Sequence, residues 1–131
     1  MVDDTYVLPV IDGVSAGFPS PARDYMEESI DLTRELVKHP HWTFLGRVKG
    51  RSMTGAGIDE DDLVVIDRSL DGTHGKVALC CFDGGFTLKR LHYANDELYL
   101  MPANPNYQPV KVEPENDFSV WGVVTYVIKK L

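Results

Sequence analysis

Cysteine is scarce in this 131-residue chain, and its only two cysteines, Cys80 and Cys81, are neighbours. Adjacent strand residues point to opposite faces, so these two thiols are not expected to pair with each other. The chain has no Cys-x-x-Cys pair, which excludes zinc sites of that spacing. His39 and His41 flank a proline, but no second pair of ligands accompanies them. The sequence therefore predicts reduced thiols, no metal site and no cofactor.

Long apolar runs and an excess of basic residues are also missing. No run approaches the roughly 18 apolar residues of a membrane helix, and Asp3 and Asp4 stand where a signal peptide would carry basic residues. We therefore expect a cytoplasmic protein without membrane association. Lys and Arg number 13 against 20 Asp and Glu, a net charge of -7. Because an acidic surface repels phosphates, we expect no direct binding to duplex DNA.

The pattern of the chain changes near residue 28. Residues 1–28 lack periodicity, and four Pro or Gly residues fall between Gly13 and Pro21. We therefore expect an extended N-terminal arm over 1–28 and a folded domain over 29–131. At the start of that domain, Asp31 can cap a short helix that Pro40 stops.

Beyond Pro40 the pattern is typical of strands, with no βαβ alternation. Residues 75–93 predict a hairpin that turns at 83–85, because Asp and Gly tolerate positive φ. Gly122 predicts a bulge or bend in a long final strand. The fold class expected is mostly β, a compact twisted sheet of β-clip type with one short helix and the extended arm. The further strands are expected at 42–50, 61–69, 97–102, 107–114 and 118–130.

Ser52 is the first candidate for chemistry. It lies between a strand that ends near Gly50 and the glycine-rich stretch 55–57. A serine at such a junction is exposed, and nearby backbone N–H groups can converge on one point, which suits a nucleophile with an oxyanion hole. A serine that caps a short helical turn would occupy the same position.

Lys89, in the second strand of the hairpin, is the other candidate. Its cross-strand partner is Cys80 if the loop is 84–85 and Ala78 if the loop is 83–84; either residue leaves room for a lysine stem. A buried lysine loses hydration, so its pKa falls and its neutral amine can act as a general base. The alternative is a lysine that snorkels to the surface.

These segments together carry a family resemblance. The stretches SAGFPSPARDY, KGRSMTGAGIDEDDLVVID, GGFTLKRL and FSVWGVVTYVIKK closely resemble the self-cleaving serine-lysine peptidases of the LexA/UmuD type, which include phage repressors. The order of the motifs matches, as does the separation of Ser52 and Lys89. The resemblance covers nearly the whole chain from about Gly17, whereas the first ten or so residues have no convincing match.

The resemblance implies a catalytic group. Ser52 would be the nucleophile and Lys89 the general base of a serine endopeptidase that acts mainly on itself. The backbone N–H groups of Arg51 and Ser52 would form the oxyanion hole. A β-rich peptidase fold is expected with this activity.

The resemblance also implies a scissile bond at Ala16-Gly17, with Val14 as an upstream docking residue. Gly17 removes bulk beside the attacked carbonyl, and Ala16 is small enough for a narrow pocket. Val14 and Ala16 share one face of an extended arm, so both can dock in the cleft.

The partners expected from the resemblance belong to the SOS response. The protein would be a homodimer, and the RecA filament on single-stranded DNA would promote its cleavage as a co-protease. The trimmed form would then join a Y-family polymerase subunit of the UmuC type and act in error-prone translesion synthesis.

Three other interpretations compete with this one. A repressor of the LexA or phage type needs a helix-turn-helix ahead of the cleaved bond, and only 16 residues precede it here. A signal-peptidase relative would normally carry a membrane anchor. In a non-catalytic scaffold that only binds the polymerase, Ser52 and Lys89 would be dispensable for the integrity of the arm.

Overall fold

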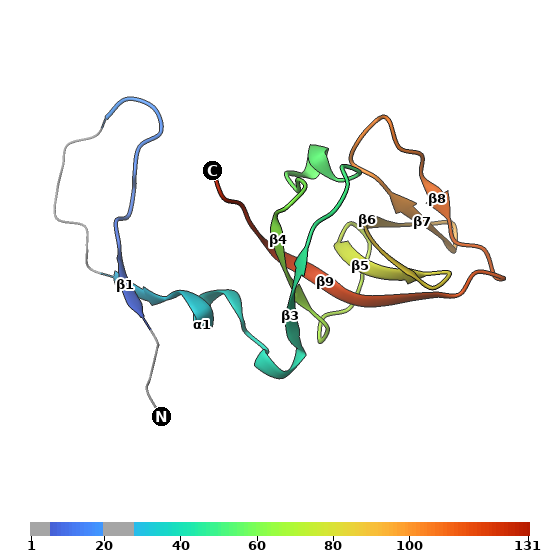
Figure 1. The fold of residues 1–131 in the computed structure, drawn as a ribbon, viewed down its shortest axis with the longest axis horizontal. Helices are drawn as coiled ribbons and strands as arrows, with labels where there is room; N and C mark the ends of the chain where they lie inside the picture. Colours follow the sequence, from blue (N-terminus) through green and yellow to red (C-terminus); the bar gives the residue numbers. More distant parts are fainter. Residues whose placement is uncertain (1–5, 20–27) are drawn as a thin grey trace. The chain divides into compact units, whose positions relative to one another are not determined.

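The computed structural model describes residues 6–19 and 28–131 and divides the chain into two compact units, Met1–Lys38 and His39–Leu131 (Figure 1). The expectations for Asp3, Asp4 and Pro21 lie outside the described residues. Among the residues that are described, no helix has both the length and the apolar character to cross a membrane.

The first unit contains a small sheet and the short helix. Strand β1 (Val7–Val10) pairs antiparallel with β2 (Glu28–Asp31), and α1 (Leu32–Leu36) follows directly. The Asp31 side chain caps α1 by accepting from the Arg34 N–H at 3.3 Å, as the sequence predicts. The two strands were not expected, because short and largely exposed strands carry no alternation of apolar and polar residues.

The second unit is one sheet of seven antiparallel strands in the order β3-β4-β9-β5-β6-β7-β8. The last strand in the sequence lies inside the sheet, between β4 and β5, where Figure 1 shows it in red. Two short 3-10 helices, η1 (Pro40–Trp42) and η2 (Thr54–Ala56), flank β3 and the Ser52 segment. The strands are β3 (Thr43–Arg47), β4 (Leu63–Asp67), β5 (Val77–Phe82), β6 (Gly85–Ala94), β7 (Glu97–Met101), β8 (Val110–Lys111) and β9 (Phe118–Ile128).

The hairpin of β5 and β6 turns at Asp83-Gly84, both of which have positive φ, 48° and 85°. The pairing of Phe82 with Gly85 then sets the register of the whole hairpin. Ala78 consequently faces Lys89, which is the second of the two registers that the sequence left open. A methyl group opposite the lysine leaves space for its stem.

Strand β9 carries the irregularity predicted at Gly122. Leu79 pairs with Gly122 and Cys80 with Val120, so Trp121 is the extra residue of a bulge. Gly122 also lets β4 approach closely, because a Cβ there would lie 2.6 Å from Ile66 Cγ2. The bend and the close packing both depend on this glycine.

Two clusters of buried side chains stabilise the second unit. One surrounds η2 and β4, and the other lies on β5, β6 and β7. Cys80 is fully buried in the second cluster, Cys81 is half-buried, and both are free thiols. The buried members are Val48, Met53, Ile58, Val64 and Ile66 in the first cluster and Ala78, Cys80, Leu91 and Leu100 in the second.

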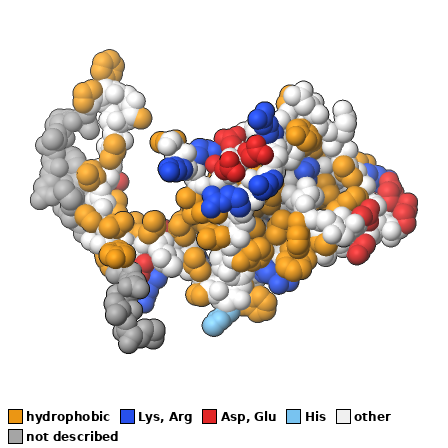
Figure 2. All heavy atoms as spheres, in the orientation of Figure 1, with side chains coloured by type: hydrophobic (Ala, Val, Ile, Leu, Met, Phe, Trp, Pro, Cys, Tyr) orange, Lys and Arg blue, Asp and Glu red, His pale blue; other side chains and the backbone are white. Residues whose placement is uncertain are grey.

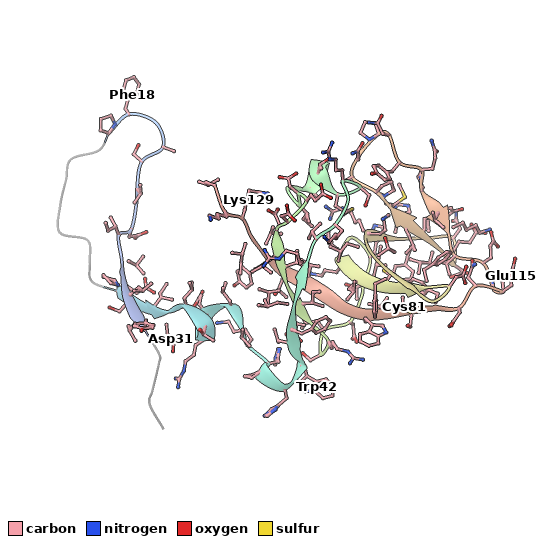
Figure 3. The ribbon with its side chains drawn as sticks, in the orientation of Figure 1. Phe18, Asp31, Trp42, Cys81, Glu115 and Lys129 are labelled. Carbon is pink, nitrogen blue, oxygen red and sulfur yellow. The ribbon has the colours of Figure 1, made fainter. Side chains whose placement is uncertain are left out.

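The end of β9 is held to the segment that follows η2 by an ionic contact. Figure 2 shows a group of acidic side chains on this unit with Lys and Arg side chains around it. Lys129, labelled in Figure 3, donates to Asp59 at 2.6 Å and also binds the buried Asp62 carboxylate. This contact links the residue just after β9 to the segment between η2 and β4.

The close packing at Gly122 predicts that a side chain at this position lowers the stability of the protein. Gly122→Ala should lower the free energy of unfolding by about 1–3 kcal/mol, because the methyl group overlaps Ile66 and the packing must shift. Urea unfolding of the two proteins measures the difference. Gly85→Ala is the matched control, since its Cβ would meet only Phe82 O at 3.8 Å. Equal stability of the two variants would contradict the prediction.

Candidate active site

Ser52 lies in a tight turn between β3 and η2. Gly50 just before it has a φ of 86°, and the Thr54 N–H donates to Arg51 O at 3.4 Å, which closes the turn. The next side chain, Met53, is only 3% exposed and anchors the turn in the core. Ser52 does not cap η2, because the N-cap position belongs to Met53 and no side chain caps it. Its half-buried hydroxyl is therefore left for other contacts.

Lys89 brings an amine to this hydroxyl. Its Nζ lies 3.0 Å from Ser52 Oγ, 2.7 Å from Thr87 Oγ1 and 3.1 Å from Leu88 O. An ammonium has three N–H donors, so these acceptors satisfy it completely. The lysine thus turns inward instead of extending into solvent.

Burial lowers the pKa of Lys89 below its ordinary value. The neighbouring Cys80 does little to oppose this, because burial raises the pKa of its thiol to about 11 and leaves it uncharged at neutral pH. No carboxylate contacts Lys89 Nζ within the described part of the chain. The amine therefore loses its proton more readily than a lysine in water.

The three contacts also suit the neutral form of Lys89. A neutral amine has two N–H donors and one lone pair. Thr87 Oγ1 and Leu88 O can each accept one N–H, which leaves the lone pair for the hydroxyl proton of Ser52. The arrangement can hold the lysine both before and after it takes up a proton.

Backbone donors lie beside the serine. Over the residues that the structure describes, the N–H groups of Arg51 and Ser52 have no hydrogen-bond acceptor within the protein. Two such groups in one turn can bind a developing negative charge on an oxygen. They are the same groups that the resemblance indicates for an oxyanion hole.

A cleft of about 320 Å³ opens at Ser52. Ser52 lines this cleft, whereas Lys89 reaches the serine from within the protein and does not line it. The surface of the cleft is largely apolar, which suits small hydrophobic side chains of a peptide. Its apolar lining consists of Phe44, Val48, Met53, Val64, Ile66, Leu79, Phe86 and Leu88.

The expected cleavage segment is exposed in the first unit. Val14 is 75% exposed and Phe18 is 94% exposed. Phe18 is labelled in Figure 3. The Ser15 hydroxyl accepts from the Gly17 N–H at 3.3 Å and donates to Phe18 O. The chain therefore bends at Ala16-Gly17, and both residues of this bond are exposed.

Two residues of the site were not singled out from the sequence. Thr87 shares a strand face with Lys89 two residues later, so the period of the strand could have suggested it. Asn104 donates from Nδ2 to Arg51 O at 2.8 Å across 53 positions of sequence, and no local signal indicates such a contact.

Comparison with known proteins shows which family the chain belongs to. Residues 9–125 match the family described as Peptidase S24-like. Protein ImpA of Salmonella typhimurium is 39% identical over 135 residues, which is 98% of this chain and 88% of that protein. Protein MucA of Escherichia coli is 40% identical over 114 residues, 86% of this chain and 77% of MucA. LexA repressor 1 of Geobacter sulfurreducens is 35% identical over 130 residues, 98% of this chain and 64% of that repressor.

ImpA and MucA are UmuD-type proteins. The match to the family model spans most of the sequence, including both Ser52 and Lys89. The chain therefore belongs to the S24-like family of self-cleaving peptidases and is of its UmuD type, the type that acts in SOS mutagenesis.

Proposed function

We propose that this protein cuts its own N-terminal arm at Ala16-Gly17, with Ser52 as the nucleophile and Lys89 as the general base. The observation that carries the proposal is the 3.0 Å contact between Lys89 Nζ and Ser52 Oγ beside an apolar cleft. A nucleophile and a base at this distance, with the pKa of the base lowered by burial, are what attack on a peptide carbonyl requires.

The first step forms an ester. Neutral Lys89 takes the proton of Ser52 Oγ, and the oxygen bonds to the carbonyl carbon of Ala16. The carbonyl oxygen becomes an anion, which the N–H groups of Arg51 and Ser52 stabilise. The bond from Ala16 to the nitrogen of Gly17 then breaks, and the ammonium of Lys89 returns its proton to that nitrogen.

The second step restores the serine. The new amino terminus at Gly17 moves out of the site, and a water molecule gives one proton to Lys89 while its oxygen attacks the ester carbon. The ester bond breaks, Lys89 returns its proton to Ser52 Oγ, and residues 1–16 depart with a new carboxyl group, which releases its proton to the solvent. One lysine thus acts first as a base and then as an acid in each half of the reaction.

The chemistry of the arm suits the cleft. Gly17 presents no side chain next to the attacked carbonyl, and Ala16 presents one methyl group. Val14 supplies a larger apolar side chain, which the lining of the cleft can accept. The exposure of this segment in its own unit leaves it free to bind as a substrate.

The cellular role that we propose follows from the UmuD type. The protein is a cytoplasmic homodimer whose cleavage is promoted by the RecA filament on single-stranded DNA. The trimmed product serves as the accessory subunit of a Y-family polymerase of the UmuC type in translesion synthesis. Its acidic charge of -7 supports a role through protein partners without direct binding to duplex DNA.

Substitution of either member of the pair tests the mechanism. Ser52→Ala and Lys89→Met should each slow self-cleavage by at least about 10³-fold, because each removes a group needed for the first step. The intact mass during incubation of the purified chain at alkaline pH measures the reaction. Lys76→Met is the control, since Lys76 is exposed and should be dispensable. Cleavage at the normal rate by a folded Ser52→Ala protein would refute Ser52 as the nucleophile, and no cleavage of the wild type would favour the non-catalytic scaffold.

The pH dependence should report Lys89. Its pKa is lowered in the folded protein, and only the neutral amine is a base, so the cleavage rate should rise with pH by about tenfold per unit below that pKa. The rate should level off at a lower pH than free lysine would give. A stopped time course at each pH provides the profile. Lys89→Arg should be inactive throughout, because a guanidinium keeps its proton; a flat profile for the wild type would refute the assignment.

The products identify the bond. Cleavage at Ala16-Gly17 should give a peptide of 16 residues and a product of 131 − 16 = 115 residues that begins with Gly17. Gly17→Lys and Ala16→Trp should block the reaction, because bulk at either position keeps the carbonyl from reaching about 3 Å from Ser52. Mass spectrometry of both products decides this, with Ser20→Ala, beyond the reacting bond, as the tolerated control. A product that begins at another residue would disprove the site.

A further inference from the structure

The segment that follows β7 packs directly onto the turn that holds Ser52. The Ala103 N–H donates to Ser52 O at 2.7 Å, and the Gly55 N–H donates to Ala103 O at 2.6 Å. Asn104 adds a side-chain contact, from Nδ2 to Arg51 O at 2.8 Å. Three hydrogen bonds thus connect two neighbouring residues to the backbone of 51–55.

The Asn104 side chain affects the proposed oxyanion hole because it binds the peptide group between Arg51 and Ser52, whose N–H is one of the two proposed donors. Arg51 C=O and Ser52 N–H belong to the same planar trans peptide, so they point in opposite directions. A donor fixed at Arg51 O therefore fixes the direction of the Ser52 N–H. It also polarises that peptide group, which makes the N–H a stronger donor.

We propose that Asn104 is a positioning residue that aims the Ser52 N–H at the oxyanion. The inference rests on the proposed self-cleavage and adds a residue to its machinery. Asn104 does not touch the reacting atoms and acts only through the peptide group between Arg51 and Ser52.

The orientation of the Asn104 amide is itself determined. The Asn106 N–H donates to Asn104 Oδ1 at 2.9 Å, and the Tyr107 N–H donates to Asn104 O at 3.1 Å. Because Oδ1 is the acceptor of this turn, Nδ2 is the end that faces Arg51 O. An aspartate here would keep the turn but would lack the donor.

Gly55 allows the close approach on which this contact depends. A Cβ on Gly55 would lie 2.5 Å from Ala103 O, far inside normal contact distance, so any side chain would push the two segments apart. The second contact of Asn104, with Thr54 Oγ1 at 3.4 Å, is longer and does not touch the peptide group of Ser52.

Two substitutions distinguish the role of the Asn104 Nδ2 donor from the role of Oδ1 in the local turn. We expect Asn104→Ala and Asn104→Asp to slow self-cleavage of the full chain by about 10–100-fold at every pH, less than the loss of an oxyanion donor itself. The pH at which the rate reaches half its plateau should not move, because the Ser52 and Lys89 pair is untouched. Thr54→Val is the control and should stay within about threefold of the wild type.

A second readout tests the oxyanion directly. A peptide boronic acid with the sequence of residues 12–16 forms a tetrahedral adduct with a serine and places an oxygen in the hole, whereas the corresponding peptide amide does not. The Asn104 variants should bind the boronic acid about 10–100-fold more weakly and the amide with unchanged affinity. Both affinities are measured on the full-length chain, with the folding of each variant checked by its melting temperature.

The outcomes are distinct. Wild-type rates in Asn104→Asp with a slow Asn104→Ala would assign the effect to the turn and overturn the inference. A loss of rate that comes with a shifted pH profile, or with equal loss of boronic acid and amide binding, would also overturn it. If Ser52→Ala cleaves as fast as the wild type, the proposed function itself fails. Asn104 would then have no catalytic N–H group to position, and the inference would fall with the proposed function.

Discussion

Lys89 holds an amine inside the protein, where no carboxylate of the described residues neutralises it, and the arrangement of the second unit follows from that constraint. A charge placed there is costly unless every donor is satisfied, and Thr87 Oγ1, Leu88 O and Ser52 Oγ satisfy all three. The register of the hairpin is what makes this possible. A shift of one residue between β5 and β6 would move the lysine to the other face of the sheet.

The site is built where rigid and irregular segments meet. Strand β6 supplies the lysine from a regular ladder, in which its rotamer is limited by the neighbours Ala78 and Thr87. The turn at Ser52 has no ladder of its own and depends on Met53 in the core and on the segment at Ala103. Strands thus fix the base, while side-chain burial and three hydrogen bonds fix the nucleophile.

The sequence predicted local features well and distant contacts poorly. The capped helix at Asp31, the hairpin turn and the bulge at Gly122 all depend on residues close in sequence, and all three are present. Ser52 and Lys89 were singled out by local chemistry, but their distance depends on packing across 37 positions, which no period encodes. Asn104 was missed for the same reason, since a lone asparagine in a turn has many local explanations.

The position of β9 inside the sheet has a consequence for biosynthesis. Strands β3 and β4 pair with each other, strands β5 to β8 form a meander, and β9 joins the two within the sheet by pairing with β4 and β5. Ser52 precedes β4 and Lys89 lies in the meander, so the two groups are on separate pieces until the final strand has left the ribosome. Contacts between distant segments form late during folding. We therefore expect a nascent chain without β9 to hold its arm and both reactive groups in an incomplete sheet, so that activity begins once the sheet is finished.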